Sequence, residues 1–320
     1  MLRVARSVII SEELCNVVRD NYDFQEPVRV KLLSVGDNDH YLINSGNENY
    51  VLRIYRNNKP WLIKKSDYFL EFELLEYLKS FNIPLSKPIK RKDKQFLGSL
   101  EVPEGKRYFA VFEYLNGSTR KNTNKSAEKL GNIISRIHDL TRDFRPKSTK
   151  KKFDVKFLLE DSSSVLKNFC YEFKYGDRVL LNKLFLEAKS RISNFARLNL
   201  ENSWGLIIGD LNQYNHLHHN SKIYLLDFDL CGYGWRSYDL ATYRWSLLKD
   251  NNSERIWHKF LEGYSKNRNF MNEEIEIIPY FVIARQMWIM ASNSTYQDLP
   301  LNKKYWDNNF KTLKKIEKLL

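Results

Sequence analysis

Gly-Asp-Leu-Asn-Gln-Tyr-Asn at residues 209–215 and Leu-Leu-Asp-Phe-Asp at residues 225–229 are the two stretches that decide the fold. Asn215 follows Asp210 by five positions, and Asp227 ends the next apolar strand, 17 positions after Asp210. Two carboxylates and an amide oxygen in this order suit one Mg²⁺ ion and one hydroxyl nucleophile. The pattern indicates phosphoryl transfer from ATP, in which a protein mainly positions the reactants and stabilises charge.

Each of these side chains can be given a chemical role. Asp227 and Asn215 are the candidate ligands of Mg²⁺, which takes one or two carboxylates and a neutral oxygen. Asp210 is the candidate catalytic residue beside the acceptor hydroxyl, and Asp229 is a further candidate for the metal or the acceptor. Taken singly, each has a plainer explanation, because Asp210 could cap a turn and the other two aspartates could simply end a strand.

Taken together, these residues resemble the aminoglycoside phosphotransferase and choline kinase-like family, a bacterial branch of the protein-kinase-like fold. In that family a His-Gly-Asp loop has Asn five residues later, and the metal Asp lies at the end of an Ile-Asp-Phe-(Asp/Glu) strand. Residues 231–241, Cys-Gly-Tyr-Gly-Trp-Arg-Ser-Tyr-Asp-Leu-Ala, are similar to the segment that follows. The resemblance implies an α+β fold with a small N-terminal antiparallel sheet lobe and a larger, mainly helical C-terminal lobe.

Two residues of the N-terminal part match the family's phosphate-binding pair. Arg53 lies in the alternating strand at residues 51–56, where the family has a Lys or Arg for the α- and β-phosphates. Arginine suits this role because its planar fork of donors is charged at any pH; the alternative is a solvated strand arginine. Glu71 opens the helical pattern at residues 71–78 and is expected to pair with this cation, with Glu73 as the competing candidate.

The remaining nucleotide contacts are carried over from the family with weaker motifs. Asn38 matches the usual Asn of the phosphate-covering loop, although residues 35–41 hold one glycine where a Gly-x-Gly-x-x-Gly loop has three. Residues 109–117 are similar to the family's hinge, where backbone groups from Glu113 to Leu115 are expected to bind adenine. An ordinary buried strand followed by a turn would explain the same letters.

Two positions stand out from the pattern. Ile208 replaces the family's His before Gly-Asp, so any hydrogen bond that braces the catalytic loop through that imidazole is missing, and activity does not follow from the motif alone. Arg285 is a cation within an apolar helical pattern. We expect it to pair with a carboxylate or to line the site, because a buried charge without a partner is costly.

Length and composition fit one two-lobed catalytic unit. The 320 residues allow two lobes with their own cores, expected at residues 1–115 for the nucleotide and 116–320 for catalysis and acceptor binding. No apolar run approaches a membrane span and no signal peptide is evident, so we expect a cytoplasmic protein. Cysteines 15, 170 and 231 are isolated and odd in number, which favours buried thiols over disulfides or a metal site.

The basic excess, 52 Lys and Arg against 39 Asp and Glu, raises the question of nucleic acid. Its densest run, residues 145–152, lacks interleaved aromatic residues and is expected to be a solvated loop, or a rim that attracts an anionic ligand. Nucleic acid is therefore not an expected partner. His216 and His218 share a strand face, but no third ligand follows at a suitable spacing for zinc.

Periodicity and turn residues give the expected elements. The helices are expected to begin at Ser11 and to cover residues 65–81, 130–140, 154–170, 178–199, 238–249, 253–267, 272–293 and 303–319. The strands are expected at residues 28–35, 40–44, 50–56, 87–91, 95–102, 107–115, 205–208, 216–218 and 222–227. Nucleotide is expected in the cleft between the lobes, with the acceptor on the helical side.

The resulting hypothesis is an ATP-dependent, Mg²⁺-requiring kinase for the hydroxyl of a small metabolite or antibiotic. Asp210 would orient and deprotonate the acceptor while Asn215 and Asp227 hold the metal and Arg53 the phosphates. Two alternatives stay open at this stage. One is a bacterial stress-response Ser/Thr protein kinase on the same fold, and the other, motivated by Ile208, is a catalytically silent member that binds a ligand.

Overall fold

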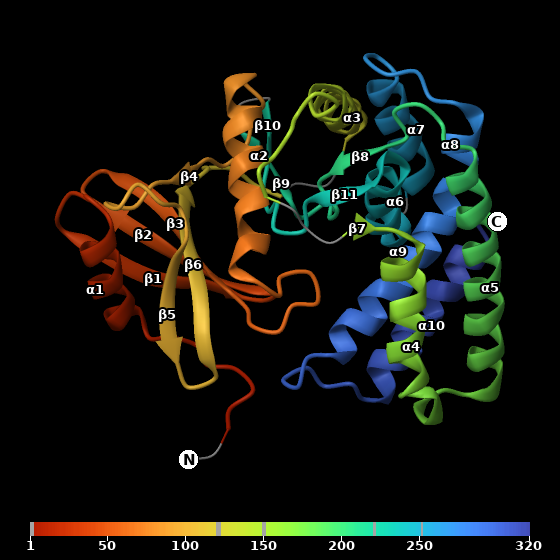
Figure 1. Cartoon of the computed structure of the whole chain (residues 1–320), viewed down its shortest axis with the longest axis horizontal. Coiled ribbons are helices and arrows are strands. Elements are labelled where there is room, and N and C mark those ends of the chain that lie inside the picture. Colours follow the sequence, from red (N-terminus) through yellow and green to blue (C-terminus); the bar gives the residue numbers. More distant parts are fainter. Residues whose placement is uncertain (1–2, 120–122, 149–151, 220–221, 251) are drawn as a thin grey trace. The chain divides into compact units, whose positions relative to one another are not determined.

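The computed structural model describes residues 3–119, 123–148, 152–219, 222–250 and 252–320. The chain divides into two compact units, an N-terminal unit of residues 1–117 and a C-terminal unit of residues 118–320. The division lies two residues beyond the expected one at Leu115. Each unit is described by itself below, with the element labels of Figure 1.

The N-terminal unit is built on one antiparallel sheet in the strand order β1-β2-β3-β6-β4, with β5 paired to β6. Its strands are β1 (Val28–Val35), β2 (Asn38–Ser45), β3 (Glu48–Tyr55), β4 (Pro88–Ile89), β5 (Gly98–Val102) and β6 (Gly105–Glu113). Strands β1, β2 and β3 follow one another through short turns. Strand β6 then pairs with β3 so that Ala110 lies opposite Arg53.

Two helices accompany this sheet. Helix α1 (Ser11–Asn21) places Leu14 and Val18 in a buried cluster with the alternating inward residues of β1, β2, β3 and β6. Helix α2 (Phe69–Ser80) follows a 3₁₀ turn (Lys65–Tyr68) and buries most of its apolar residues, together with Glu71. The burial of a glutamate in an otherwise apolar helix face indicates that it has a partner inside the unit.

The C-terminal unit is mainly helical, and α9 lies at its centre with contacts to α4, α5, α6 and α10 (Figure 1). Its helices are α3 (Asn124–Leu140), α4 (Asp161–Lys167), α5 (Tyr175–Arg197), α6 (Arg236–Ser246), α7 (Ser253–Tyr264), α8 (Asn272–Glu276), α9 (Ile278–Ser294) and α10 (Lys303–Glu317). Short turns of helix lie at Lys156–Glu160, Cys170–Glu172 and Leu247–Lys249. Almost every residue of α9 is buried, as expected for a helix without a polar face.

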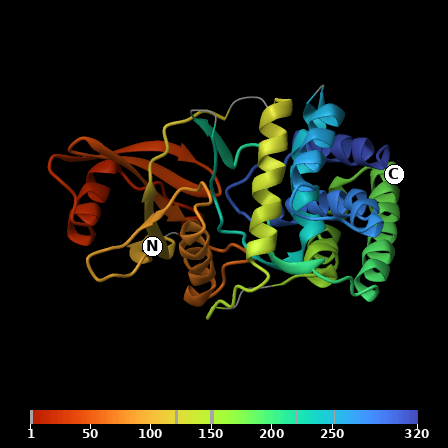
Figure 2. The ribbon, with the colours of Figure 1, turned by 90° about the horizontal axis from the view of Figure 1, so that it is seen from above.

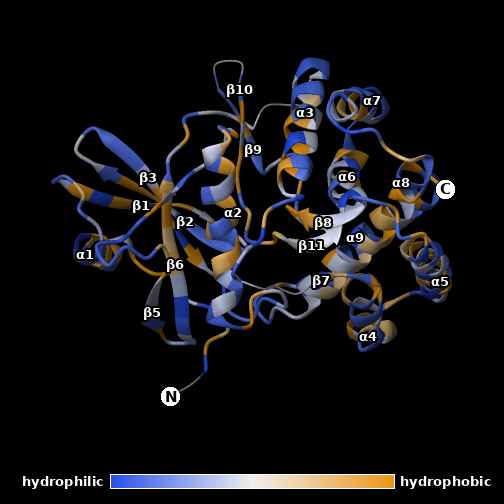
Figure 3. Ribbon diagram, turned by 45° about the horizontal axis from the view of Figure 1, so that its top comes forward, coloured by the Kyte–Doolittle hydropathy of each residue, from blue (hydrophilic) through white to orange (hydrophobic). Residues whose placement is uncertain are grey.

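Helices α3 and α7 run side by side (Figure 2) and approach closely because each has a glycine at the contact. A Cβ on Gly131 would lie 2.0 Å from the carbonyl oxygen of Phe260, and one on Gly263 would lie 1.8 Å from that of Glu128. Outside this contact, both helices carry hydrophilic residues beside hydrophobic ones (Figure 3), which is typical of amphipathic surface helices.

Short strands complete the C-terminal unit, five of them within the residues that the structure describes. A hairpin is formed by β9 (His216–His219) and β10 (Lys222–Leu225), and a second sheet has the order β7-β11-β8, from β7 (Lys152–Phe153), β11 (Gly232–Trp235) and β8 (Trp204–Ile207). Strand β8 leads into the Gly-Asp loop, and the chain returns to β11 after Asp229. The small sheet and the hairpin therefore frame the loop that carries the candidate catalytic residues.

Most expectations for the fold are confirmed, with three differences. Residues 272–293 form two helices, because the chain breaks at Ile277 before Pro279 starts α9. Strands β7 and β11 were not expected. The expectation of three buried thiols is wrong for Cys170, which is exposed, while Cys15 is half-buried and Cys231 buried. Among the residues that the structure describes, no helix is long and apolar enough to cross a membrane.

Candidate active site

The catalytic loop brings Asp210 and Asn215 into direct contact. The amide nitrogen of Asn215 donates to Oδ2 of Asp210 over 3.1 Å and to its backbone oxygen over 3.0 Å. On its other oxygen, Asp210 forms an ion pair with Arg285 of α9, whose side chain is 5 % exposed. The expectation that Arg285 pairs with a carboxylate is thus confirmed. The Asp210 side chain is still 19 % exposed, so a small hydroxyl compound can reach it.

Backbone geometry holds Asp227 next to this loop. The N–H of Leu226 donates to the carbonyl oxygen of Asn215 over 2.9 Å, which joins the two segments that carry the metal candidates. Asp227 has a φ of +57°, a left-handed conformation that costs free energy for a residue other than glycine and that occurs often at active sites. Asp229 follows two positions later and is buried.

Gly209 allows the loop to approach the strand end after Asp227. Its φ is +81°, and a Cβ at this position would lie 2.4 Å from the carbonyl oxygen of Leu230. Only glycine satisfies both the backbone conformation and the close contact. The glycine before Asp210 therefore allows the loop backbone to lie against Leu230, in the turn that follows Asp229.

Helix α6 holds the backbone of the catalytic loop, a role that our sequence analysis missed. Asp239 accepts the N–H of Ile208 over 2.8 Å and that of Gly209 over 2.7 Å. One turn later, the Thr242 hydroxyl oxygen accepts the N–H of Leu211 over 3.0 Å. Ser246, a further turn on, accepts the N–H of Gln213 over 3.2 Å. The signal in the sequence was the spacing of Asp239, Thr242 and Ser246, which puts three acceptors on one helix face.

This arrangement answers the question raised by Ile208. Its side chain is buried, and the imidazole usual at this position in the family is absent. The loop is nevertheless braced, because Asp239 binds the backbone at positions 208 and 209 irrespective of the side chain. Loss of that histidine therefore does not leave the loop without support.

His138 of α3 forms a hydrogen bond with the side chain of Asp239. Its Nε2 lies 3.0 Å from Asp239 and its Nδ1 lies 2.7 Å from the Tyr264 hydroxyl, and both ring and carboxylate are fully buried. This arrangement suits a neutral ring that donates to Asp239 and accepts from Tyr264. Burial lowers the pKa of His138 to about 4, although hydrogen bonding to Asp239 acts in the opposite direction. His216 is shifted in the same way, because burial and the neighbouring His218 lower its pKa to about 4.

These two histidines predict acid sensitivity of the fold. Both are neutral in the folded protein and have a pKa near 6.5 when unfolded, so the unfolded chain binds more protons between pH 6.5 and 4. The free energy of unfolding should then decrease as pH falls through this window, by up to about 1.4 kcal/mol per pH unit for each histidine. Urea unfolding between pH 6.5 and 5 would measure this slope before most carboxylates titrate.

A matched pair of variants assigns the effect. His138→Gln should reduce the slope of stability against pH, whereas His258→Gln, at an exposed position of α7, should leave it unchanged. A wild-type protein whose stability is constant between pH 6.5 and 5 would contradict the neutral, buried state of both rings.

In the N-terminal unit, Arg53 and Glu71 form a buried ion pair. Nη1 of Arg53 lies 2.7 Å from Glu71, and the two side chains are 7 % and 1 % exposed. The Tyr55 hydroxyl donates to the other carboxylate oxygen over 2.7 Å, and the guanidinium carbon lies 4.4 Å from the centre of the Phe112 ring. The sequence left Glu71 and Glu73 as alternatives, and the structure pairs Glu71 with the arginine.

The other candidate nucleotide-binding residues of the N-terminal unit are Asn38, Glu113 and Leu115, and the first two make hydrogen bonds within the unit. The Asn38 side chain is buried, and its Oδ1 accepts from Nζ of Lys59 over 2.7 Å; its contact with the nucleotide stays a prediction. The N–H of Glu113 donates to Lys87 and its carbonyl accepts from Ser86, each over 2.8 Å. The groups left for adenine are a second lone pair on that carbonyl and the N–H of Leu115, which makes no hydrogen bond within the described residues.

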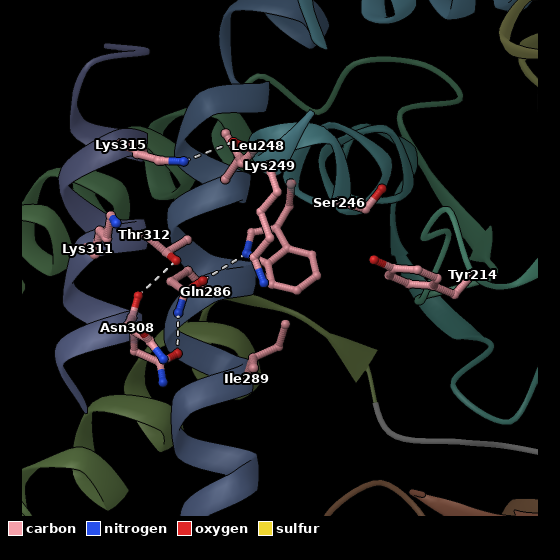
Figure 4. A pocket seen from close by; sticks show the side chains of 12 residues that line it. Tyr214, Ser246, Leu248, Lys249, Gln286, Ile289, Asn308, Lys311, Thr312 and Lys315 are labelled. Carbon is pink, nitrogen blue, oxygen red and sulfur yellow. Dashed lines mark hydrogen bonds between the residues drawn. The ribbon is translucent and has the colours of Figure 1, made fainter. Parts of the chain in front are cut away.

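A pocket of about 510 Å³ opens beside the catalytic loop within the C-terminal unit. Tyr214 of the loop lies on one side, and Lys311 and Lys315 of α10 lie on the other (Figure 4). Gln286 of α9 is fixed in the pocket wall by hydrogen bonds with Trp245 and Asn309, over 2.8 and 2.7 Å. Its neighbour in sequence is Arg285, the partner of Asp210, and Tyr214 places the pocket beside the loop that carries Asp210.

The oxygen donors of Asp227 and Asn215 suit a hard cation such as Mg²⁺, whose remaining ligands would be phosphate oxygens and water. Within the described residues, no group of three or more His, Cys, Asp and Glu could hold a metal by itself. Asp227 and Asn215 offer a carboxylate and an amide oxygen, and Mg²⁺ is commonly held by one or two carboxylates while phosphates and water complete its shell.

His216 and His218, which the sequence places on one strand face, have ring centres 5.3 Å apart in an edge-to-face arrangement.

Comparison with known proteins decides the family. Residues 30–273 of the chain match the phosphotransferase enzyme family. The chain belongs to this family. The match covers both units, from strand β1 to helix α8, and includes the catalytic loop. The chain is therefore an enzyme of the phosphotransferase class, as the resemblance of the two acidic stretches indicated.

Relatives and solved structures agree with this assignment. An uncharacterized protein of Deinococcus radiodurans is 30% identical over 89% of the chain and 82% of its own length. The amicoumacin kinase of Bacillus subtilis is 24% identical over 76% of each chain. Among solved structures, a microcompartment-associated aminopropanol kinase has a TM-score of 0.79 at 18% identity, covering 95% of both chains. An amicoumacin kinase in complex with AMP-PNP, Ca²⁺ and Ami has a TM-score of 0.76 at 20% identity, covering 96% and 93%.

These likenesses confirm the fold class. The phosphotransferase has the antiparallel N-terminal sheet and helical C-terminal part that the family resemblance implied, and structures at this level of identity share its fold over almost their full length. They do not by themselves assign roles to single residues, which rest on the geometry of this chain.

Proposed function

We propose that this phosphotransferase moves the γ-phosphate of ATP, with Mg²⁺, to a hydroxyl group of a small molecule. The observation that carries the proposal is Asp210, which is held between Arg285 and Asn215 and remains partly exposed. A carboxylate fixed on both oxygens has little freedom to turn, so it can orient an acceptor hydroxyl in line with a phosphate. We extend the proposal to a cytoplasmic location, because ATP is available there.

In this proposal the other residues bind and position the donor. Arg53, held by Glu71, would bind the nucleotide phosphates, and the Glu113 carbonyl and Leu115 N–H would bind adenine. Asp227 and the Oδ1 atom of Asn215 would hold Mg²⁺, which supplies charge neutralisation for the phosphates when bound. The amide nitrogen of Asn215 is turned toward Asp210, so its oxygen lies on the opposite side of the amide group, as a metal ligand requires.

The pocket beside Tyr214 is the proposed acceptor site. Among its described lining residues, Lys249, Lys311 and Lys315 are cations and none is a carboxylate. Such a lining favours a neutral or anionic hydroxyl compound over a polycationic aminoglycoside, because like charges repel in a partly desolvated pocket. One structural neighbour is by its name a kinase of aminopropanol, an amino compound, so the charge of this pocket is a distinguishing feature.

A mass-spectrometric screen tests the function directly. The purified full-length protein would be incubated with Mg-ATP and pooled hydroxyl compounds, with separate pools of sugar acids and hydroxy acids, neutral sugars and nucleosides, amino alcohols, aminoglycosides, and peptides. We expect a gain of one phosphate in the acidic or neutral pools. Phosphorylation of peptides alone, or of no compound in any pool, would contradict a small-molecule kinase.

A further inference from the structure

A second pocket of the C-terminal unit, of about 490 Å³, collects positive charge away from the loop that carries Asp210. Its wall comes from the end of α3 and from β7, β8, β11 and the start of α6. Four of its described lining residues are cations, and none is a carboxylate: Arg142, Arg145, Lys152 and Arg236. We name this the Arg236 pocket.

Arg236 is the buried element of this site. Its side chain is 1 % exposed, and Nε and Nη1 make no hydrogen bond with any part of the chain that the structure describes. Burying Nε and Nη1 without hydrogen-bond partners is costly, because the three N–H donors on these two atoms lose water without compensation. Burial, and next the charge of Arg268, lower the pKa of Arg236 to about 10. The fold therefore holds the guanidinium of Arg236 in an environment that disfavours its charged form.

Gly205 of β8 leaves space for the Arg236 guanidinium. A Cβ on Gly205 of β8 would lie 3.1 Å from Nη2 and 3.3 Å from Nε of Arg236, so the guanidinium lies against the bare glycine. The absence of a side chain at residue 205 leaves the space that the head group of Arg236 occupies, and both residues line the pocket.

The neighbouring carboxylates form no ion pair with Arg236 within the described residues, although the charge of Glu274 acts to raise its pKa. Glu274 accepts from Arg268 over 2.6 Å and from the N–H of Met271 over 3.2 Å. At the surface, Asp139 lies 3.3 Å from Arg142. Each of these carboxylates thus has another cation as its partner, and the pocket keeps an excess of positive charge.

We propose that the Arg236 pocket binds a small anion through a phosphate group, which accepts hydrogen bonds from the buried Arg236 guanidinium. A phosphate group is favoured over a single carboxylate because it carries up to two charges and three acceptor oxygens, and because it fits the planar fork of arginine. The cavity is larger than inorganic phosphate needs, so a phosphate monoester with a small body fits. This site is independent of the proposed phosphoryl transfer.

The proposal also gives a use to the basic run at residues 145–152. Arg145 at its start and Lys152 at its end both line the Arg236 pocket, while residues 149–151 between them lie outside the described residues. The two described ends would supply the outer charges that attract an anion toward the buried arginine.

Calorimetric titration of the full-length protein tests the site, without nucleotide or divalent ion, using inorganic phosphate, pyrophosphate and ribose 5-phosphate as probes. We expect binding of at least one probe at millimolar concentration or tighter, and Arg236→Met should weaken it by about tenfold or more, since it removes charge-assisted hydrogen bonds. Preference for ribose 5-phosphate would point to a phosphate monoester, and preference for the inorganic probes to free phosphate. Equal affinity in wild type and Arg236→Met would overturn the proposal.

Matched double variants cover the case in which Arg236→Met does not fold. Arg142→Ala/Arg145→Ala removes two exposed cations of the Arg236 pocket, and Lys311→Ala/Lys315→Ala removes two exposed cations beside Tyr214. Only the first pair should weaken probe binding, by about threefold or more, as expected for loss of exposed charges. Weakening by the second pair alone would assign the anion to the acceptor pocket and overturn the proposal.

Stability separates a ligand site from a structural one. In anion-free buffer, Arg236→Met should be at least as stable as wild type, because it removes a buried charge that has no partner. Phosphate should raise the melting temperature of wild type only, through preferential binding to the folded state. A variant that is less stable without anion and is stabilised by phosphate as much as wild type would show that Arg236 serves the fold alone.

Discussion

Asp210→Asn is expected to lower the turnover number by about 10²–10⁴-fold while Mg-nucleotide still binds. Asparagine keeps the shape of the side chain but removes the negative charge that orients the acceptor hydroxyl and takes its proton. Asn215 and Arg285 contact different oxygens of Asp210, so the amide, with one acceptor oxygen, keeps one of these two contacts and loses the other. The nucleotide is proposed to be held mainly by other residues, so the loss should still fall on the chemical step. Turnover of an acceptor found in the screen, with calorimetry of Mg-AMP-PNP binding, separates the two effects.

A matched control keeps this test specific. Asp23→Asn makes the same replacement at a side chain that is 85 % exposed in the N-terminal unit, and it should retain full turnover. If Asp210→Asn and Asp23→Asn turn over at the same rate, Asp210 has no catalytic role. If Asp210→Asn instead fails to bind nucleotide, the charge of this residue serves the donor site and the assignment to the acceptor is wrong.

The candidate site was predictable where chemistry demands particular residue types at short range. Asp210, Asn215 and Asp227 follow from the needs of a divalent ion and a nucleophile, and the structure joins their segments through the Asn215 hydrogen bonds. The loop brace at Asp239 was not predictable in this way. It depends on which backbone N–H groups meet the face of α6, and those contacts span about 30 residues of sequence.

Asn38 shows that tertiary packing adds contacts which a family pattern does not indicate. The letter matches the phosphate-covering loop, but in this chain Lys59, 21 positions later, occupies its side-chain oxygen. Neither periodicity nor a local motif indicates that lysine as a partner, since the contact arises from tertiary packing. The same holds for Glu71, whose choice over Glu73 depended on the side of α2 that faces Arg53 in β3.

Fold elements were predictable where apolar periodicity was long. Strands β1 to β3 and β6 are eight or nine residues long and were expected within two residues of their observed bounds. Strand β11 is Gly-Tyr-Gly-Trp, and glycine has low strand propensity. The structure explains the glycine, because a Cβ on Gly234 would lie 2.6 Å from Ile207 and 3.0 Å from Phe153. At Gly234, the close packing of β7, β8 and β11 outweighs the low strand propensity of glycine.

Asp239→Ala is expected to lower the stability of the C-terminal unit by about 3–5 kcal/mol, the range for removing one partner from a buried charged network. Asp239 is fully buried and accepts hydrogen bonds from two backbone N–H groups and from His138. Alanine leaves all three donors without an acceptor, and no water replaces the carboxylate without cost. Scanning calorimetry should show a melting temperature lower by roughly 6–20 °C.

The same change should also reduce turnover, because the brace lies directly before Asp210. Without Asp239, the N–H groups of Ile208 and Gly209 have no fixed acceptor, and the glycine gives this part of the backbone freedom to turn. Asp139→Ala provides the control: this aspartate is 56 % exposed on α3 and makes only a surface ion pair with Arg142, so its loss should cost at most about 1 kcal/mol. A similar small cost for Asp239→Ala, with full turnover, would mean that the catalytic loop holds its conformation without α6.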